Sequence, residues 1–155
     1  MRFKTTTDSF VEFVSTQPTW YNGFNSPYYT SSHEAFRAKV RAFVEREIAP
    51  HTHEWDESKT IPAEVYRKTY AAGILPAVVG KPWPKDLVPE CEEPKDFDYF
   101  HELIVFDEFA RCGSGGVLWG LLEGLHIGLP PVLNFGSEDL RQRVGAPCLR
   151  GEGII

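Results

Sequence analysis

The stretch SSHEAFRAKVRAFVEREI, from Ser31 to Ile48, sets the fold class of this chain. Its apolar side chains recur at the spacing of an amphipathic α-helix, and its charged side chains fall mostly on the opposite face. The apolar positions are Phe36, Val40, Phe43, Val44 and Ile48. Ser31 followed by Glu34 predicts a capping box at the start of this helix. Pro50 lacks the amide that an α-helix needs, so we expect the helix to break or kink there.

A second helix is predicted in the stretch IPAEVYRKTYAAG, residues 61–73. Pro62 falls near its first turn, where the missing amide costs nothing, and Gly73 is expected to end the helix. A long connector follows, marked by Pro76, Pro82, Pro84, Pro89 and Pro94. Because prolines interrupt helices, the connector separates this helix from the next one.

The third predicted helix is YFHELIVFDEFARC, residues 99–112, with Asp96 or Asp98 as its N-cap. An apolar stripe at helical spacing runs along it. The stripe is made of Tyr99, Leu103, Phe106 and Ala110. Glu102 and Glu108 fall outside this stripe, so the stripe is the face that we expect to pack on the core.

The stretch VLWGLLEGLHIGL, residues 117–129, is apolar almost all the way round apart from Glu123 and His126. A helix of that kind is surrounded by protein, and Pro130 with Pro131 is expected to end it. Ser137 then predicts the N-cap of a last helix, with acidic residues against the positive end of its dipole. These patterns predict an all-α fold, a helical bundle of about five helices.

The two ends of the chain differ from the predicted bundle. Residues 1–31 show no sustained period and are rich in aromatic side chains, so we expect an irregular N-terminal arm packed on the domain's own apolar surface. A platform for stacking bases needs a cationic groove, and the aromatic stretch has no Lys or Arg. The predicted division is 1–31 for the arm, 32–153 for the helical domain and 154–155, Ile154 and Ile155, for the first step of a strand.

Composition and charge exclude several classes of protein. The 155 residues are 42% hydrophobic and 25% charged, which is typical of a globular domain. A formal net charge of -6 disfavours nucleic acid and anionic membrane surfaces as partners. No apolar run reaches the length that we expect of a membrane span. The odd count of three cysteines, without CxxC spacing, indicates neither a disulfide framework nor a zinc site, and favours an intracellular location.

Two local motifs resemble ligand sites without meeting their requirements. The stretch HTHEWDE, residues 51–57, has the composition of a metal site, but His51 and His53 point to opposite sides of a helix. His53 and Glu57 are better spaced, although a solvated helix end with Trp55 turned inward explains the stretch better. The stretch CGSGGV, residues 112–117, lacks both the preceding strand and the lysine of a phosphate-binding loop, so a tight turn between helices is expected. We also find no nucleophile with a base beside it.

Glu123 and His126 are the polar residues that most need a role. A charged carboxylate among apolar neighbours is costly unless it is paired. Glu123 could pair with an arginine of another helix or with His126 three positions on. The alternative is that this face of the helix lines a ligand pocket. Periodicity does not decide between these two possibilities.

Several stretches resemble the N-terminal helical domain of the acyl-CoA dehydrogenase family, flavoenzymes that desaturate acyl thioesters. They are FVEREIAPHTHEWDESKTIP, YRKTYAAGIL, VFDEFARCGSG and HIGLPPVLNFGSEDLRQRVGAPCLRGE, and the resemblance covers residues 33–155. The last stretch is the most specific, since it combines a proline turn, an FGSE cap, a basic helix and a GE exit. The resemblance implies that Ile154 and Ile155 begin a strand of a β-domain that is absent here.

The resemblance also implies a function for the parent enzyme. A glutamate removes the α-proton of an acyl-CoA substrate while the β-hydride passes to the N5 atom of FAD. That base and most FAD contacts lie in the absent part, so no catalytic, cofactor-binding or metal residue is assigned here. The positions of Trp119, Glu123 and Ile127 are implied to face the distal end of the acyl pocket. The parent is expected to be a homo-oligomer without a membrane span.

Departures from the family keep other functions open. The connector GKPWPKDLVPECEEP stands where the family commonly has a Gly-Gly turn, and the aromatic arm has no counterpart in compact members. One hypothesis is the N-terminal portion of an acyl-CoA dehydrogenase, inactive alone. Alternatives are a portion of a related nitroalkane oxidase and a stand-alone helical binding module without catalysis.

Overall fold

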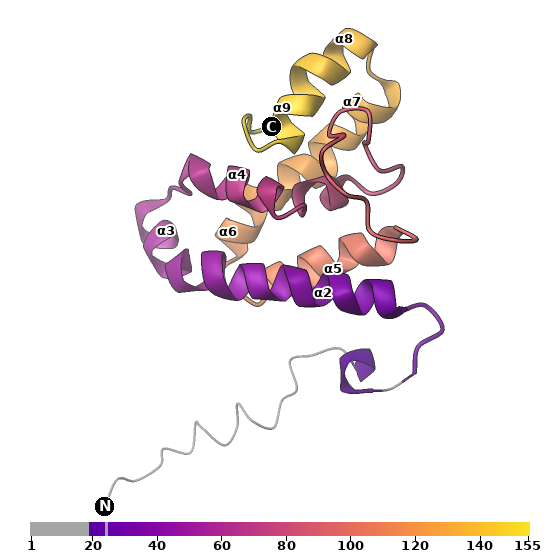
Figure 1. Cartoon of the computed structure of the whole chain (residues 1–155). Coiled ribbons are helices and arrows are strands. Elements are labelled where there is room, and N and C mark those ends of the chain that lie inside the picture. Colours follow the sequence, from indigo (N-terminus) through magenta and orange to yellow (C-terminus); the bar gives the residue numbers. More distant parts are fainter. Residues whose placement is uncertain (1–18, 24) are drawn as a thin grey trace, which may run out of the picture.

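The computed structural model describes residues 19–23 and 25–155 of the chain. Over these ranges it contains helices and turns and no strand, which confirms the predicted all-α class (Figure 1). The elements in chain order are η1 (Thr19–Asn22), α2 (Ser31–Phe43), η2 (Val44–Ile48), η3 (Ala49–His51), α3 (Thr52–Ser58), α4 (Ala63–Ala71), η4 (Leu75–Val79), α5 (Tyr99–Ala110), α6 (Gly115–Leu118), η5 (Trp119–Gly128), α7 (Leu129–Phe135), α8 (Glu138–Leu140), η6 (Arg141–Gly145) and α9 (Ala146–Leu149).

Several of these elements join end to end into longer helices. Segments η2, η5 and η6 are π-helical, while η1, η3 and η4 are 3₁₀ turns. The five predicted helices correspond to α2 with η2, to α4, to α5, to α6 with η5 and α7, and to α8 with η6 and α9. The helix breaks at Pro50, as predicted, because this proline opens the 3₁₀ turn η3.

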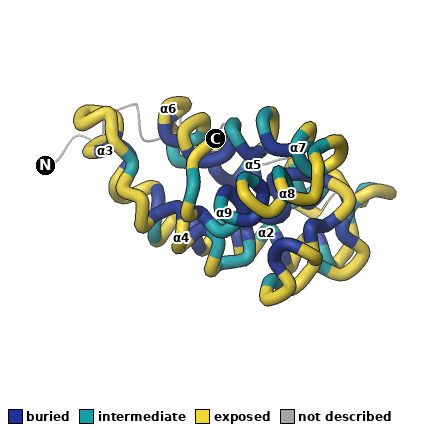
Figure 2. The backbone as a smooth tube through the Cα atoms, turned by 90° about the horizontal axis from the view of Figure 1, so that it is seen from above, coloured by how far each residue is buried: buried dark blue, intermediate teal, exposed yellow. Residues whose placement is uncertain are grey.

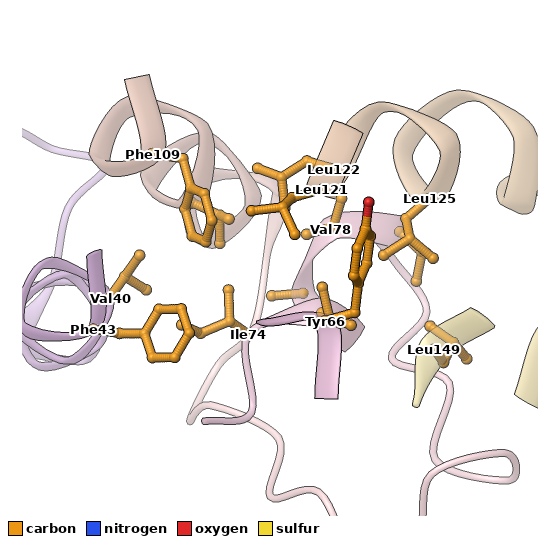
Figure 3. Packing of buried hydrophobic residues seen from close by; sticks show 14 of the residues in the cluster. Val40, Phe43, Tyr66, Ile74, Val78, Phe109, Leu121, Leu122, Leu125 and Leu149 are labelled. Carbon is orange, nitrogen blue, oxygen red and sulfur yellow. The ribbon is translucent and has the colours of Figure 1, made fainter. Parts of the chain in front are cut away.

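One hydrophobic core is shared by all the long helices. Figure 3 shows its middle, where Phe43 of α2 and Phe109 of α5 face Ile74 and Leu122. Tyr66 of α4 packs beside them and donates its hydroxyl hydrogen to the Gly120 carbonyl over 2.9 Å. Buried residues gather around α2, α5 and α9, and exposed residues dominate α3 and α8 (Figure 2). The helices therefore share one interior and belong to one domain.

Helices α2 and α5 lie side by side and run in the same direction (Figure 1). His33 near the start of α2 is hydrogen-bonded to Asp98 at the start of α5, over 2.9 Å. Further along, Arg41 of α2 is paired with Glu108 of α5. Polar contacts thus tie the two helices at both ends.

The structure confirms the predicted N-caps Asp98 and Ser137 and corrects the predicted capping box at Ser31. The hydroxyl oxygen of Ser137 accepts the Leu140 amide, and Asp98 accepts the amide of Phe100. The predicted capping box of Ser31 and Glu34 is wrong, because the box lies one residue earlier. The N-cap is Thr30, whose backbone amide donates to Nδ1 of His33 over 2.9 Å. Histidine offers the same acceptor as the usual Glu or Gln, which is why the composition rule missed it.

The helix that begins at Gly115 does not end at Pro130 and Pro131. It continues to Phe135, and the prolines lie just after the junction where the π-helical segment η5 runs into α7. The full helix has 21 residues, and an 18-residue window within it has a mean hydropathy of 1.3, so by length and composition it could cross a membrane. An apolar run of this length was not expected from the sequence, because the helix was predicted to end at Pro130 and Pro131. Leu121, Leu122, Leu125 and Leu129 of this helix are buried in the core, and 28% of the 18-residue window is buried.

The apolar stripe predicted for α5 lies on the wrong side of the helix. Tyr99 and Leu103 are exposed, whereas the face that packs on the core is the other one. Its buried residues are His101, Ile104, Val105, Glu108 and Phe109. The helix is apolar on two faces, so periodicity alone could not choose between them. Polar partners on α2 allow His101 and Glu108 to be buried.

The described part of the arm packs on α2 and α5. The rings of Trp20 and Tyr29 stack with their centroids 3.9 Å apart, and the Tyr21 hydroxyl donates to Asp107 over 3.0 Å. The guanidinium of Arg37 lies 3.4 Å from the centroid of the Tyr21 ring. Most of the predicted arm, residues 1–18 and 24, lies outside the described residues. The boundary at residue 31 therefore stays a prediction.

The last residues form neither helix nor strand. Ile155 packs against η5 so closely that a Cβ at Gly124 would lie 2.1 Å from its carbonyl oxygen. Ile154 is largely exposed. A strand needs a paired neighbour, and the described residues provide none, so the predicted first strand step is not formed in this structure.

Replacing Ser114 with alanine is expected to destabilise the domain by about 1 to 2 kcal/mol. Its hydroxyl accepts the Val117 amide over 3.0 Å and donates to Asp56 over 2.6 Å, which joins α6 to α3. Urea unfolding followed by circular dichroism measures the change. Ser137→Ala, which removes an exposed cap without a second partner, is the matched control and should cost less. Equal losses in the two variants would contradict the role of the Asp56 contact.

Candidate functional site

Exposed apolar side chains gather where α5 lies beside η5. The residues on this surface, called the α5–η5 face below, are Tyr99, Leu103, Phe106, Trp119, Glu123, His126 and Ile127. Trp119 is 67% exposed and Ile127 is 66% exposed, both high values for large apolar side chains. Helix η5 buries Leu121, Leu122 and Leu125 on its other side. The expectation that this helix is surrounded by protein is therefore wrong for the described chain, since one side is open.

Two helices contribute a polar group to the centre of this face. Nε2 of His126 on η5 lies 2.8 Å from Oε1 of Glu102 on α5, and its Nδ1 lies 4.0 Å from Glu123. Burial raises the pKa of Glu102, and the nearby His126 opposes that rise. The ring of His126 also contacts Phe106, with centroids 4.7 Å apart. The partner of His126 is thus Glu102, which sequence reasoning missed because the pairing crosses between helices.

The three residues proposed from the family resemblance share one side of η5. Trp119, Glu123 and Ile127 follow one another at a spacing of four residues, opposite the buried leucines. Trp119 and Ile127 project to solvent, while the Glu123 side chain is partly buried. Among the described residues, Glu123 has His126 as its ion-pair partner and no arginine. The predicted alternative of an arginine from another helix is therefore not found. Their role toward a ligand stays a prediction.

A second polar cluster lies at the starts of α2 and α5. His33, Asp98 and His101 place one ligand-type atom each within 4.8 Å of one another, the composition of a metal site. The hydrogen bonds favour a structural role. Nδ1 of each ring accepts the backbone amide of its own N-cap residue, Thr30 or Asp98, at 2.9 and 3.2 Å. The two positive helix ends also disfavour a cation there.

The remaining contacts of this cluster are satisfied as well. His33 donates from Nε2 to Asp98, and Nε2 of His101 lies 3.1 Å from Oγ of Ser32. Ser32 donates its own hydrogen to the Lys95 carbonyl over 2.6 Å, so it accepts from His101. Both rings therefore connect the starts of α2 and α5 through hydrogen bonds. Burial would raise the pKa of Asp98, but its hydrogen bond with His33 and its contact with His101 lower it.

This arrangement predicts that acid weakens the fold. Burial and the adjacent His33 lower the pKa of His101 from 6.5, although its contact with Asp98 opposes the shift. As the pH falls below 6.5, the unfolded chain takes up a proton that the folded chain refuses, so stability is lost. The urea midpoint should drop between pH 7.5 and 5.5. His101→Gln, which keeps an acceptor without titrating, should flatten the drop, whereas exposed His53→Gln should not. A drop unchanged in His101→Gln would contradict this assignment.

A third polar cluster surrounds Glu108, whose side chain is 0% exposed. Arg41 donates from Nε and Nη2 to its two oxygens, each over 2.8 Å. Arg37 approaches within 3.2 Å and Arg111 within 3.4 Å. Sequence reasoning did not find this cluster, because Glu108 was placed outside the core stripe. It holds α2, α5 and the arm together.

The other motifs take the structural roles that were expected. Trp55 is buried and His51 stacks on it, and the metal-type cluster found in the described chain does not include His53 or Glu57. The glycines after Cys112 form a tight turn that leads into α6. All three cysteines are free.

Comparison with known proteins agrees with this helical domain. The family model described as "Acyl-CoA dehydrogenase, N-terminal domain" matches residues 30–152. An acyl-CoA dehydrogenase of Alternaria alternata is 35% identical over 141 residues, which cover 88% of this chain and 33% of that protein. The short-chain specific acyl-CoA dehydrogenase of Bos taurus mitochondria is 28% identical, over 79% of this chain and 27% of that protein.

Solved structures give the same result. The acyl-CoA dehydrogenase of Geobacillus kaustophilus superposes with a TM-score of 0.68 at 25% identity, over 84% of this chain and 31% of that one. A putative acyl-CoA dehydrogenase of Mycobacterium smegmatis gives 0.66 at 34% identity, over 83% of this chain and 32% of that one. The chain spans about a third of the length of the curated relatives it matches first. With the family model matching most of its length, the chain belongs to the acyl-CoA dehydrogenase family, as its N-terminal helical domain.

Proposed function

We propose that this chain is the N-terminal portion of an FAD-dependent acyl-CoA dehydrogenase that forms the α,β double bond of an acyl-CoA thioester. The observation that carries this proposal is the α5–η5 face, where four large apolar side chains are exposed on two helices, namely Tyr99, Leu103, Trp119 and Ile127. An exposed apolar surface of this kind marks a site for a ligand or another protein segment. The chemistry of proton and hydride removal belongs to residues outside this chain, which is proposed to be inactive alone.

Within that enzyme, Trp119, Glu123 and Ile127 are proposed to line the distal end of the acyl pocket. Trp119 would limit the length of the acyl chain, because its ring fills space on this face. Glu123 lies 4.0 Å from His126, which is paired with Glu102. These three polar side chains are therefore connected, and they lie beside the apolar side chains of the face. They would orient the end of the acyl group or a water molecule there.

The flavin does not fit the glycine turn of this chain. FAD supplies the hydride acceptor of the family reaction, and its pyrophosphate needs free backbone amides and positive charge. At the start of α6, the amide of Val117 is already bonded to Ser114, and the Asp56 carboxylate lies 3.2 Å from where a Cβ on Gly116 would be. A carboxylate repels phosphate, so no flavin contact is assigned to this turn.

The deciding experiment is spectroscopic. The coding sequence is followed past codon 155, the longer product is purified, and its visible spectrum is recorded. Flavin bands that bleach on addition of an acyl-CoA support the proposal. Bleaching by a nitroalkane instead would identify a nitroalkane oxidase, and a well-folded product without flavin would favour the stand-alone binding module.

In the longer enzyme, Trp119→Ala is expected to shift the substrate preference toward longer acyl chains. Removing the ring opens space for added methylene groups, each worth about 1 to 3 kcal/mol in a pocket, or roughly tenfold or more in kcat/KM. The measurement is kcat/KM for a series of acyl-CoA lengths. Tyr28→Ala, which removes an exposed ring at the other end of α5 beside Phe100, is the control. An unchanged length profile would remove Trp119 from the pocket.

Two further properties are proposed on the same basis. Several relatives are named as mitochondrial enzymes, including those of Bos taurus and Sus scrofa. We propose an intracellular location for this chain without choosing a compartment. A homo-oligomeric parent is proposed as well, and the mass of the longer product in solution tests it.

A further inference from the structure

A cavity of about 270 Å³ lies between the proline-rich connector after η4 and the helices α7 and α8–η6. The polar residues that line it are Lys81, Trp83, Asp86, Asn134 and Arg141. None of these residues belongs to the α5–η5 face. Lys81, Trp83 and Asp86 belong to the connector, and Asn134 and Arg141 come from the helices.

Two buried hydrogen-bond donors of this cavity have no acceptor. The indole nitrogen of Trp83, in a side chain only 7% exposed, has no hydrogen-bond partner among the described residues. The same holds for Nε of Arg141. Buried polar atoms without partners are rare in native proteins, and a bound ion or water molecule that accepts their hydrogen bonds is one explanation for them. Both residues line this one cavity, so one acceptor group could serve both.

The surroundings hold these donors in place. The ring of Trp83 packs edge-on against Phe97, with centroids 5.0 Å apart. Arg141 is anchored through Nη2 to the carboxylate of Asp86, which leaves its Nε without a partner. With the positive charges of Lys81 and Arg141 against the single negative charge of Asp86, the lining carries an excess positive charge. This excess is local, because the whole chain has a net charge of -6.

We propose that this cavity binds a small oxyanion, a carboxylate or a phosphate group, through Trp83, Arg141 and Lys81. The donor set contains two fixed N–H groups and a flexible ammonium, which suits two or three oxygens of one group. An apolar ligand would leave both donors unpaired. Water can accept their hydrogen bonds but gains little from the positive charge.

The test follows the indole N–H signal of Trp83 by NMR in the ¹⁵N-labelled 155-residue chain, with Trp83→Phe identifying the signal. Sodium phosphate and sodium acetate are titrated separately at constant ionic strength, with sodium chloride as the matched salt. We expect a saturable shift with one or both oxyanions and none with chloride. Saturation by phosphate alone or by acetate alone identifies which of the two groups the cavity accepts.

Variants show whether the cavity is responsible. Arg141→Gln is expected to weaken binding about tenfold or more, because it removes a charged donor. Arg143→Gln, on the same helix but paired with Asp139 outside the cavity, should bind like the original chain. If Arg141→Gln loses its helical circular dichroism, exposed Lys81→Gln takes its place and should also weaken binding. The absence of a saturable shift, or full binding by both cavity variants, overturns the proposal.

Discussion

Replacing Glu108 with glutamine is expected to lower the free energy of unfolding by about 3 kcal/mol, the largest loss from any polar substitution in this domain. The carboxylate is fully buried and accepts hydrogen bonds from Arg37 and Arg41. Its removal takes away the buried negative charge that Arg37, Arg41 and Arg111 share, and the new amide group directs donors at donors. We expect a loss near the lower end of the range for breaking a buried ion pair, because all three arginines keep some exposure to water.

Urea unfolding at pH 7 measures this loss, with Glu93→Gln as the control. Glu93 is exposed in the connector, so its replacement should change stability by less than about 0.5 kcal/mol. A second variant, Arg41→Gln, removes the partner that donates two hydrogen bonds and should also be strongly destabilising. If Glu108→Gln unfolds at the same urea concentration as Glu93→Gln, the cluster does not hold α2 and α5 together.

The cluster around Glu108 also shows what the sequence could and could not predict. Local signals predicted local structure well: Pro50 interrupts a helix, Gly73 follows the end of α4, and Ser137 is an N-cap. These features depend on one residue and its immediate neighbours in the chain. The all-α class follows from them, since each helix is specified within its own stretch.

Features that depend on pairing between helices were not predicted. Helix α5 has two apolar faces, and only the arginines of α2 and the ring of His33 decide that the face with His101 and Glu108 turns inward. The same applies to His126, whose nearest carboxylate is that of Glu102 on α5, at 2.8 Å, while the carboxylate of Glu123 lies 4.0 Å away. The candidate site residues Trp119, Glu123 and Ile127 came from the family resemblance, because an exposed apolar face has the same periodicity as a buried one.

Replacing Gly151 with alanine is expected to destabilise the domain by about 3 kcal/mol, the sum of two separate costs. Gly151 has a φ of 67°, which costs about 1 to 2 kcal/mol for a residue with a Cβ. A Cβ there would also lie 2.5 Å from the backbone carbon of Tyr66 and 2.8 Å from the amide nitrogen of Arg67. Backbone atoms of α4 cannot move aside as a side chain can, so overpacking adds about 1 to 3 kcal/mol. The glycine lets the chain leave α9 in direct contact with α4.

Two other glycines separate these costs. Gly113 has a φ of 78° and nothing within 4 Å of the position of a Cβ, so Gly113→Ala should show the conformational cost alone. Gly115 has neither a positive φ nor a close neighbour, so Gly115→Ala should change stability little. Urea midpoints of the three variants should therefore fall in the order Gly115→Ala, Gly113→Ala, Gly151→Ala, from highest to lowest. If Gly151→Ala is no less stable than Gly113→Ala, the exit from α9 does not press on the backbone of α4.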